Sequence, residues 1–367
     1  MFDGLNSLLF QKLPFHNNRL MKLFWIQLFK KSPINFRQFA GVPKSHNPKA
    51  LALFISGLIN LARYYENDQY IEEALQLSQK LLSFKSKGYA GSGWGYDFPW
   101  QARVFYVPAF KPNMVVSTFV GQALLDLHEV TAETCYLDEA EKIAGFMRQE
   151  MAMEKENSSI CFRYVPGEDA VIHNVNLLGA AFLSRLFAVT AKRDYQYIAE
   201  ESVRYSVNAQ RSDGAWVYGK KGYHQWVDNF HTGYNLVSIY AYQQFCGDNQ
   251  FESSIANGIA FHRNQHFTNR FIPKYADISL YPIDIHCYAQ AIISALTLKE
   301  YWQDYRDFLT GIVQNVINSM YDASGQYFYY QRHKHLTNKI PYIRWSQAWM
   351  FYALTKYLTS NIESNTT

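Results

Sequence analysis

The stretch NLLGAAFLSRLFAV, residues 176–189, is followed after a short polar turn by YQYIAEESVRYSV, residues 195–207. Both segments carry apolar residues three and four positions apart, which is the spacing of an amphipathic helix. The first segment is rich in small and apolar residues and suits close packing on both faces, whereas the second carries more charge and suits an outer layer. The stretch therefore predicts a helical hairpin with one inner and one outer helix.

The same hairpin pattern recurs along the chain. Aligning the apolar cores of six first helices places one aliphatic residue of each in register: Leu61, Leu127, Leu186, Ile239, Leu298 and Leu354. In the first three units a Tyr and an Ala mark the second helix: Tyr70 and Ala74, Tyr136 and Ala140, Tyr195 and Ala199. A recurring period of this kind indicates a repeat architecture. Six hairpins can close into two concentric rings, and the alternative is an open solenoid, which would normally carry polar caps.

This reading divides the chain into three parts. Residues 47–359 are expected to form the all-α toroid, and residues 360–367 a disordered tail. Residues 1–46 form a basic helical segment that packs on the toroid. Because the sixth first helix ends near residue 359, the tail is too short to supply its partner. We therefore expect the helix at residues 17–31 to complete the outer ring.

The N-terminal segment also admits a second role. Residues 1–49 contain eight Lys or Arg residues against one acidic residue, Asp3, and include the basic, apolar stretch LMKLFWIQLFKK at residues 20–31. Basic amphipathic helices can lie on anionic membrane surfaces. Weak peripheral membrane contact through this segment is thus an alternative to simple packing with a solvated basic face.

Composition excludes several classes of protein. Hydrophobic residues make up 48% and charged residues 18% of the 367 residues, so a large core is available and a disordered chain is excluded. The net charge of +4 is too balanced for a nucleic-acid binder. Four widely spaced cysteines fit neither a zinc site nor a disulfide scaffold. No apolar run reaches the roughly 18 residues of a membrane span, and no signal peptide is apparent, so we expect a soluble cytoplasmic protein.

The six hairpins resemble the (α/α)6 toroid of the six-hairpin glycosidase superfamily, and the related toroids of terpene cyclases and protein prenyltransferases. The resemblance is architectural and covers about residues 47–359. Residues 210–216, QRSDGAW, also resemble the Q-x3-G-x-W turn of terpene cyclase repeats, which implies that Gln210 and Trp216 tie an outer helix to the loop after it. The acidic signatures of the cyclases, Asp-x-Asp-Asp and Asp-Asp-x-x-Asp, are absent, so the turn is interpreted as architecture.

Long loops between outer and inner helices are expected to gather at one end of the toroid, where the inner helices begin. These loops carry the candidate catalytic residues: Asp97, Asp228, Asp284, His231 and His286. Asp97 lies among aromatic residues that would raise its pKa, as a general acid requires, although it can also pair with Arg103 or cap a turn. Asp228 and Asp284 each precede an inner helix and can equally be N-caps.

The same loops offer aromatic, amide and cationic groups that suit a polar ring-shaped ligand. Aromatic faces stack on sugar rings, amides bond hydroxyl groups, and Arg pairs with carboxylates. The candidate substrate-binding residues are Trp94, Tyr96, Trp100, Arg103, His173, Asn174, Trp216, Tyr218, Trp226, Asn229, Tyr234, Tyr288, Arg344, Trp345 and Gln347. His333 and His335 lack a nearby carboxylate, so no metal is expected, and no nucleotide loop or other cofactor site is apparent.

The leading hypothesis is a glycoside hydrolase-like enzyme acting on a glycan or a uronic-acid-containing saccharide, for example in cell-surface polysaccharide metabolism. Such hydrolysis needs two carboxylates, about 5 Å apart for retention or about 6.5–9.5 Å apart for inversion. Asp97 or Asp284 would be the acid and Asp228 the base or nucleophile. The alternatives are a sugar epimerase or polysaccharide lyase, in which His231 and His286 move a proton, a non-catalytic glycan- or lipid-binding toroid, and a prenyltransferase- or terpene-cyclase-like protein.

Overall fold

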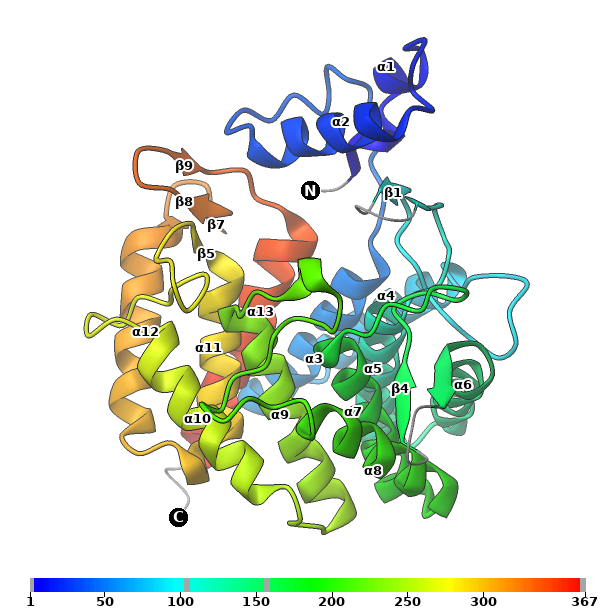
Figure 1. The fold of residues 1–367 in the computed structure, drawn as a ribbon, viewed down its shortest axis with the longest axis vertical. Coiled ribbons are helices and arrows are strands. Elements are labelled where there is room, and N and C mark those ends of the chain that lie inside the picture. The colour runs from blue at the N-terminus through cyan, green and yellow to red at the C-terminus, as the bar shows by residue number, and fades with distance from the viewer. Residues whose placement is uncertain (1–2, 102–105, 155–158, 364–367) are drawn as a thin grey trace.

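Helices arranged in two concentric rings make up most of the molecule, for which we describe a computed structural model of residues 3–101, 106–154 and 159–363. The inner ring is formed by α3 (Pro48–Tyr65), α5 (Met114–Thr131), α7 (His173–Thr190), α9 (Asn229–Cys246), α11 (Ile285–Thr297) and α13 (Ala348–Glu363). The outer helices are α4 (Gln69–Ser83), α6 (Thr134–Phe146), α8 (Arg193–Val207), α10 (Glu252–His266) and α12 (Tyr305–Met320). The predicted toroid of helical hairpins is confirmed (Figure 1).

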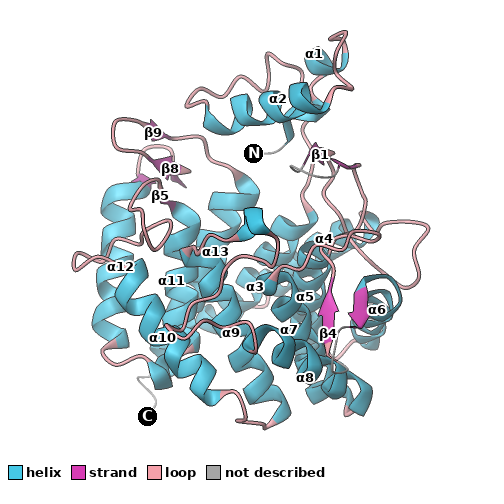
Figure 2. Ribbon diagram, in the orientation of Figure 1, coloured by secondary structure: helices cyan, strands magenta, loops and turns pink. Residues whose placement is uncertain are grey.

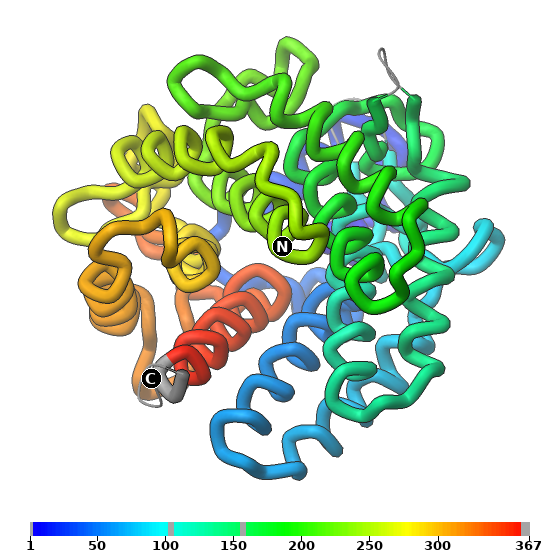
Figure 3. Tube along the Cα trace, turned by 90° about the horizontal axis from the view of Figure 1, so that it is seen from below, coloured from blue at the N-terminus to red at the C-terminus, as the bar shows by residue number. Residues whose placement is uncertain are grey.

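The ring closes because the last inner helix packs against the first. Seen along its axis, α13 lies beside α3, although the two are at opposite ends of the chain (Figure 3). Gly57 lies at this contact, where a Cβ atom would stand 2.5 Å from Cε1 of Phe351. Only a residue without a side chain permits that approach. The open solenoid is therefore excluded.

Local signals explain where the inner helices begin and end. Asn47 and Asn113 cap α3 and α5, each accepting a hydrogen bond from a backbone N–H of the first turn. At the other end, Glu66, Ala132 and Ala191 adopt left-handed backbone conformations, and each N–H bonds to the carbonyl four residues before it. This repeated left-handed C-cap directs the chain into the next outer helix within a few residues. The main hydrophobic core fills the space between the two rings.

Short antiparallel strands occur only in the connecting loops of the described chain (Figure 2). β1 (Trp100–Gln101) pairs with β2 (Tyr106–Val107), β3 (Ala152–Glu154) with β4 (Ile160–Phe162), and β6 (Tyr321–Asp322) with β7 (Tyr327–Phe328). β8 (Gln331–Arg332) lies between β5 (Ile283–Asp284) and β9 (Thr337–Asn338). Short 3₁₀ segments cover Asp3–Asn6, Gly222–His224 and Lys299–Tyr301, and π-helical turns cover Met147–Met151 and Ile343–Gln347.

The QRSDGAW turn has the architectural role that the resemblance implied. The side-chain amide of Gln210 donates to the carbonyl oxygen of Gly214 at 2.9 Å and to that of Ser254, on α10, at 3.0 Å. The indole N–H of Trp216 donates to the carbonyl oxygen of Ser206, on α8, at 2.8 Å. Gly214 has φ +91°, and a Cβ there would lie 2.3 Å from the carbonyl oxygen of Asn257. The turn thus joins the loop to two successive outer helices.

The N-terminal helix takes a different place from the one predicted. α1 (Leu8–Gln11) and α2 (Arg19–Lys31) lie over the end of the toroid at which the long loops gather, not in the outer ring (Figure 1). The loop between α12 and α13 holds α2 there, because the Tyr342 hydroxyl donates to the carbonyl oxygen of Phe29 and the Asn338 amide to that of Ser32. The other side of α2 contacts β1. The prediction that this helix completes the outer ring is therefore wrong.

The C-terminal boundary also differs slightly. α13 continues to Glu363, past the predicted end of the toroid at residue 359, and residues 364–367 lie outside the described residues. Among the helices of the described chain, none combines the length and apolar character that crossing a membrane requires.

Candidate functional site

A cavity of about 540 Å³ opens at the end of the toroid where the inner helices begin, beneath α2; we call it the mouth cavity. Most of its wall is aromatic, with Tyr218 and Trp226 stacked at a centroid distance of 4.5 Å. Its polar lining among the described residues comprises Lys30, Lys49, Gln101, Asn174, His224, Asp228, His231, His286 and Arg344, together with several tyrosines. Aromatic faces with a few convergent polar groups are typical of a site for a small polar ring.

A carboxylate–imidazole pair lies at the start of α9 in the wall of this cavity. Asp228 is the N-cap of α9, where Oδ1 accepts the backbone N–H of His231 at 3.0 Å. Its other oxygen, Oδ2, accepts Nδ1–H of the His231 ring at 2.7 Å and the indole N–H of Trp226 at 2.9 Å. Because a carboxylate can only accept, Nδ1 of neutral His231 carries the proton, and Nε2 has the free lone pair. Asp228 is therefore the N-cap that the sequence suggested, and its second oxygen holds the ring of His231.

A second histidine lies on the neighbouring inner helix. His286, on α11, forms a 2.5 Å hydrogen bond through Nε2 with the hydroxyl of Tyr234, on α9. Burial lowers the pKa of His286 well below its usual value, and the positive charges of Lys49 and Arg344 lower it further. His231 and His286 both pack against the ring of Phe230, with centroid distances of 4.1 and 4.8 Å. The two imidazoles therefore occupy one region of the cavity wall.

Asp284 is buried behind this wall and is not among the residues that line the cavity. It caps α11, and it accepts hydrogen bonds from the side chains of Gln331 and Trp345 as well as the backbone N–H of His286. Burial raises the pKa of Asp284 to about 6, although these hydrogen bonds and the charge of Lys30 act in the opposite direction. The carboxyl group is thus protonated over a wider pH range than usual.

The pH dependence of the free energy of unfolding provides a test of this raised pKa. Since the pKa of Asp284 is higher in the folded than in the unfolded chain, its contribution to stability is fully present below about pH 4 and is lost as pH rises through 6. Two pKa units correspond to about 3 kcal/mol. Urea unfolding measures the free energy of unfolding of wild type and of Asp284→Asn. We expect the difference, wild type minus variant, to fall by up to this amount between pH 4 and 7. A difference that does not change with pH would contradict a raised native pKa.

Eight of the predicted substrate-binding residues line the mouth cavity: Tyr96, Trp100, Asn174, Tyr218, Trp226, Tyr234, Arg344 and Trp345. Of the predicted catalytic residues, Asp228, His231 and His286 do so as well. Asn174 brings a buried side-chain oxygen that no donor in the described chain satisfies. Residues from several loops therefore line one cavity.

Other predicted residues lie elsewhere. Asp97 is half-buried outside the cavity lining, where its carboxylate accepts a 3.3 Å hydrogen bond from the Asn47 side chain. Six further predicted residues pack within the fold and do not line the cavity: Trp94, His173, Trp216, Asn229, Tyr288 and Gln347. Burial lowers the pKa of His173, for example, to about 4. Arg103 lies outside the described residues. Asp97, Asp228 and Asp284 therefore do not face one another across the cavity.

Two lysines that line the cavity are not among the residues predicted from the sequence. Lys49 is the second residue of α3, and Lys30 reaches the cavity from α2. The sequence PKAL around Lys49 reads as an ordinary helix start, and Lys30 reads as part of a solvated basic face. The signal that could have indicated Lys49 is its position in the first turn of an inner helix, two residues after the N-cap Asn47, at the end of the toroid where the loops gather.

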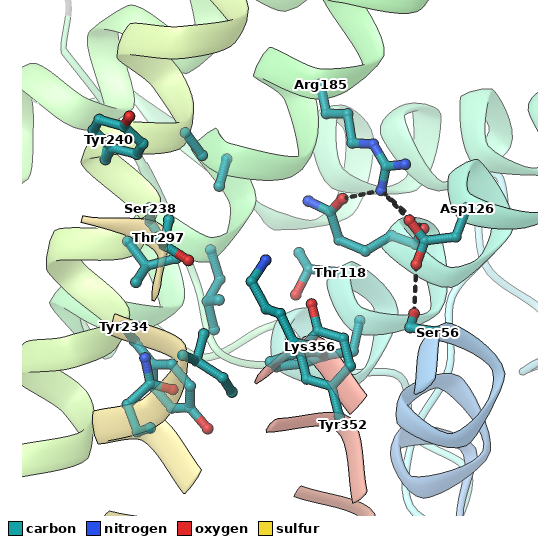
Figure 4. A pocket seen from close by; sticks show the side chains of 18 of the residues that line it. Ser56, Thr118, Asp126, Arg185, Tyr234, Ser238, Tyr240, Thr297, Tyr352 and Lys356 are labelled. Carbon is teal, nitrogen blue, oxygen red and sulfur yellow. Dashed lines mark hydrogen bonds and ion pairs between the residues drawn. The ribbon is translucent and has the colours of Figure 1, made fainter. Parts of the chain in front are cut away.

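A second pocket of about 370 Å³ lies at the opposite end of the toroid, and we call it the opposite pocket (Figure 4). Arg185 there binds Asp126 at 2.6 Å, and Asp126 accepts a hydrogen bond from Ser56 at 2.5 Å. The rings of Phe119, Tyr234 and Trp349 separate the two cavities, with centroid distances of 5.2 to 6.3 Å between them. Nowhere in the described part of the chain do three or more His, Cys, Asp or Glu side chains gather as metal ligands.

Solved structures of sugar-acting proteins are similar to this chain over most of their length. A cellobiose 2-epimerase from Bacillus thermoamylovorans has a TM-score of 0.69 at 11% identity, covering 86% of this chain and 88% of that one. This chain shares the fold of these sugar-acting proteins. A family 76 α-mannanase from Bacteroides thetaiotaomicron has a TM-score of 0.69 at 12% identity, covering 87% and 88%. An unsaturated glucuronyl hydrolase specific for heparin has a TM-score of 0.62 at 14% identity, covering 86% of each.

At these identities the likeness establishes the toroid, which confirms the fold expected from the repeats. No protein-family model matches the sequence, and no curated protein sequence matches it either. The chemistry of the mouth cavity must therefore carry the functional argument.

Proposed function

We propose that this protein is a carbohydrate-active enzyme that moves a proton at a sugar carbon, as a sugar epimerase does, with His231 as its base. The single observation that carries the proposal is the hydrogen bond between Asp228 and Nδ1 of His231, which in the neutral ring places the free lone pair on Nε2, in an aromatic cavity. A carboxylate that holds an imidazole in one tautomer is a common way to prepare a general base. The fold shared with a cellobiose 2-epimerase supports the same reading.

The chemistry would run on an open-chain sugar. Nε2 of His231 takes the proton from the carbon beside the carbonyl group, and the electron pair of that C–H bond moves onto the carbonyl oxygen to give an enediolate. Protonation of that carbon from the other face then gives the epimer. Tyr234 and His286 form the candidate second proton donor and acceptor, since burial keeps the Tyr234 hydroxyl protonated and His286 neutral.

Glycoside hydrolysis is the second candidate function, and one observation favours it. The raised pKa of Asp284, about 6, suits a general acid, and its partner Trp345 lines the cavity. Against it, Asp228 is the one carboxylate among the described lining residues, and it already accepts three hydrogen bonds. A two-carboxylate mechanism needs a second acid facing the same sugar.

Incubation of the protein with reducing mono- and disaccharides in deuterium oxide tests the proposal. Proton transfer at carbon places deuterium on a carbon of the recovered sugar, which NMR and mass spectrometry detect. Hydrolysis instead releases a new reducing end without a carbon–deuterium bond. The proposal fails if saccharides are cleaved without carbon exchange, or if His231→Asn retains wild-type exchange.

We further propose that the protein is cytoplasmic and meets the membrane surface through its N-terminal segment. Cys135, Cys246 and Cys287 are free thiols, as in a reducing compartment. Eight large apolar side chains of this segment are exposed, and we call them the exposed apolar face: Leu8, Leu9, Phe15, Leu20, Phe24, Leu28, Ile34 and Phe39. Phe39 is 91% exposed and Leu20 73%. Leu20, Phe24 and Leu28 share one side of α2, opposite the buried Ile26 and Phe29.

The positive charges of the N-terminal segment favour an anionic lipid surface as the partner that binds this face. Lys12, Arg19, Lys31 and Lys44 are exposed beside the apolar side chains. The one acidic residue of the described segment, Asp3, is already paired with Arg37 at 2.8 Å. Apolar insertion together with Lys and Arg contacts is the usual basis of peripheral binding to the anionic cytoplasmic leaflet. Because α2 also covers the mouth cavity, the site would face the bilayer.

Vesicle co-sedimentation tests this contact. We expect wild type to bind vesicles that contain phosphatidylglycerol, and the double variant Leu20→Asp/Phe24→Asp to bind at least about tenfold more weakly, because two exposed apolar side chains that would enter the lipid become charged. Val189→Asp, at an exposed apolar position near the end of α7, is the matched control and should bind as wild type. Equal loss in the control contradicts the proposal, and a change of oligomeric state without vesicle binding would assign the face to a second copy of the chain.

A further inference from the structure

Lys49 is a buried cation in the wall of the mouth cavity. Its side chain leaves the first turn of α3, and the residue is only 4% exposed. The ammonium nitrogen lies over three aromatic rings, 4.5 Å from the centroid of Phe119, 4.8 Å from that of Trp349 and 5.8 Å from that of Tyr234. These are the rings that separate the mouth cavity from the opposite pocket. Lys49 therefore stands at the floor of the mouth cavity.

No carboxylate in the described chain forms an ion pair with this ammonium group. Burial lowers the pKa of Lys49 well below its usual value, and the nearby charge of Arg344 lowers it further. Cation–π contacts offset only part of the cost of removing an ammonium group from water. A methionine would fill the same space without that cost, so the fold alone gives no reason for a lysine here.

Arg344 adds a second positive charge to the same wall. Its guanidinium carbon lies 4.6 Å from the centroid of Tyr96 and 5.8 Å from that of Phe98. The terminal nitrogen Nη2 is buried and has no hydrogen-bond partner in the described chain. The charge of Arg344 lowers the pKa values of both Lys49 and His286, which places the three groups close together. Unsatisfied donors of this kind are ready for an acceptor from a ligand.

We propose that Lys49 and Arg344 form a subsite for an anionic substituent of the saccharide, a carboxylate or a phosphate group. The inference rests on the proposed function, because it assigns the substrate class of the same cavity. An anion placed between the two cations supplies the missing counter-charge and accepts the free guanidinium N–H. The sugar ring then lies against the aromatic wall, which includes Tyr234 beside Lys49.

The alternative role for these cations is to stabilise negative charge that develops on the sugar during the reaction. That role predicts equal binding of neutral and anionic sugars and a loss of turnover for both. The anionic subsite instead predicts a preference at the binding step. Binding measured without turnover distinguishes the two roles.

Calorimetric titration of the full-length protein tests the subsite with three probes: glucuronate, glucose 6-phosphate and glucose. We expect wild type to bind at least one of the two anionic sugars about tenfold or more tightly than glucose. Lys49→Met and Arg344→Met should each reduce that preference to about twofold or less. Lys356→Met, which removes a lysine lining the opposite pocket, is the matched control and should keep it. The stronger of the two anionic probes identifies the group as a carboxylate or a phosphate.

Thermal unfolding gives a second readout that keeps the test informative if binding is weak. Lys49→Met should unfold at the wild-type temperature or above it, because it removes a buried charge without a counter-ion. A clear fall in Tm for this variant would assign Lys49 a structural role and overturn the inference. So would wild-type protein that prefers neither anionic sugar over glucose, or Lys49→Met protein that keeps the preference.

The outcomes separate this inference from the proposed reaction. His231→Asn leaves both cations in place, so it should keep the anion preference even where it abolishes deuterium exchange. If exchange depends on His231 while Lys49→Met still prefers the anionic sugar, the reaction stands and the subsite fails. If Lys49→Met loses the preference while His231→Asn exchanges deuterium normally, the subsite stands and the proposed base fails.

Discussion

Asp228→Asn is expected to lower the rate of deuterium exchange into the sugar by about a thousandfold or more. An asparagine can keep the N-cap of α9, since its oxygen can still accept the backbone N–H of His231. What it cannot do is accept from the ring nitrogen of His231 with the strength of a carboxylate and fix the neutral tautomer with Nε2 free. Loss of the orienting carboxylate in comparable pairs costs several orders of magnitude.

The matched readout for this variant is stability. Because the cap is retained, Tm should stay within a few degrees of wild type, so that a loss of activity cannot be attributed to unfolding. Asp97→Asn is a suitable comparison, since Asp97 lies outside the cavity lining and bonds to Asn47. Asp228→Asn protein with wild-type exchange, or Asp97→Asn protein with the larger loss, would move the catalytic carboxylate away from α9.

Trp216→Ala should destabilise the fold by about 3–5 kcal/mol, the usual cost of removing a fully buried aromatic side chain. Trp216 is 2% exposed and wedged between two outer helices. Its indole N–H bonds to the carbonyl oxygen of Ser206 on α8, and its ring approaches Gly258 on α10, where a Cβ would lie 2.8 Å from Cζ3. No neighbouring backbone can move in to fill the space without breaking the Gln210 bonds to the same turn.

Urea unfolding followed by circular dichroism measures this loss, and Trp216→Phe provides the control. Phenylalanine keeps most of the buried area but lacks the indole N–H, so it should lose about 1–2 kcal/mol. Sugar binding by Trp216→Phe should match wild type, because Trp216 does not line the mouth cavity. A stable Trp216→Ala protein with impaired sugar binding would restore the ligand role that the sequence suggested for this residue.

The helical repeat was predictable because it depends on local patterns. Leu61 lies in α3 at the same position that the buried Leu127 and Leu186 take in α5 and α7, as the alignment predicted. Ile239 is less well aligned: it lies one turn early in α9, and Tyr242 takes the equivalent position. Apolar spacing determines that a helix forms and which side is buried, but it tolerates a shift of one turn when both residues are apolar.

Features that depend on contacts distant in sequence were not predictable. The position of α2 is decided by hydrogen bonds to Asn338 and Tyr342, some three hundred residues away. Asp97 stands among aromatic residues in the sequence, yet it turns toward Asn47 instead of the cavity. The aromatic rings around the ammonium group of Lys49 come from α5, α9 and α13. The residues next to Lys49 in the sequence give no sign of these contacts.

The partition formed by Phe119, Tyr234 and Trp349 limits how a polymer can be handled. A toroid with an unobstructed axis could be threaded, and a long chain could slide through it between successive turnovers. With these rings between the two cavities, we expect a bound glycan to insert a terminus into the mouth cavity and to withdraw along the same route. For the proposed reaction we therefore expect chain ends or short sugars to be the substrates, with each product released before the next substrate enters.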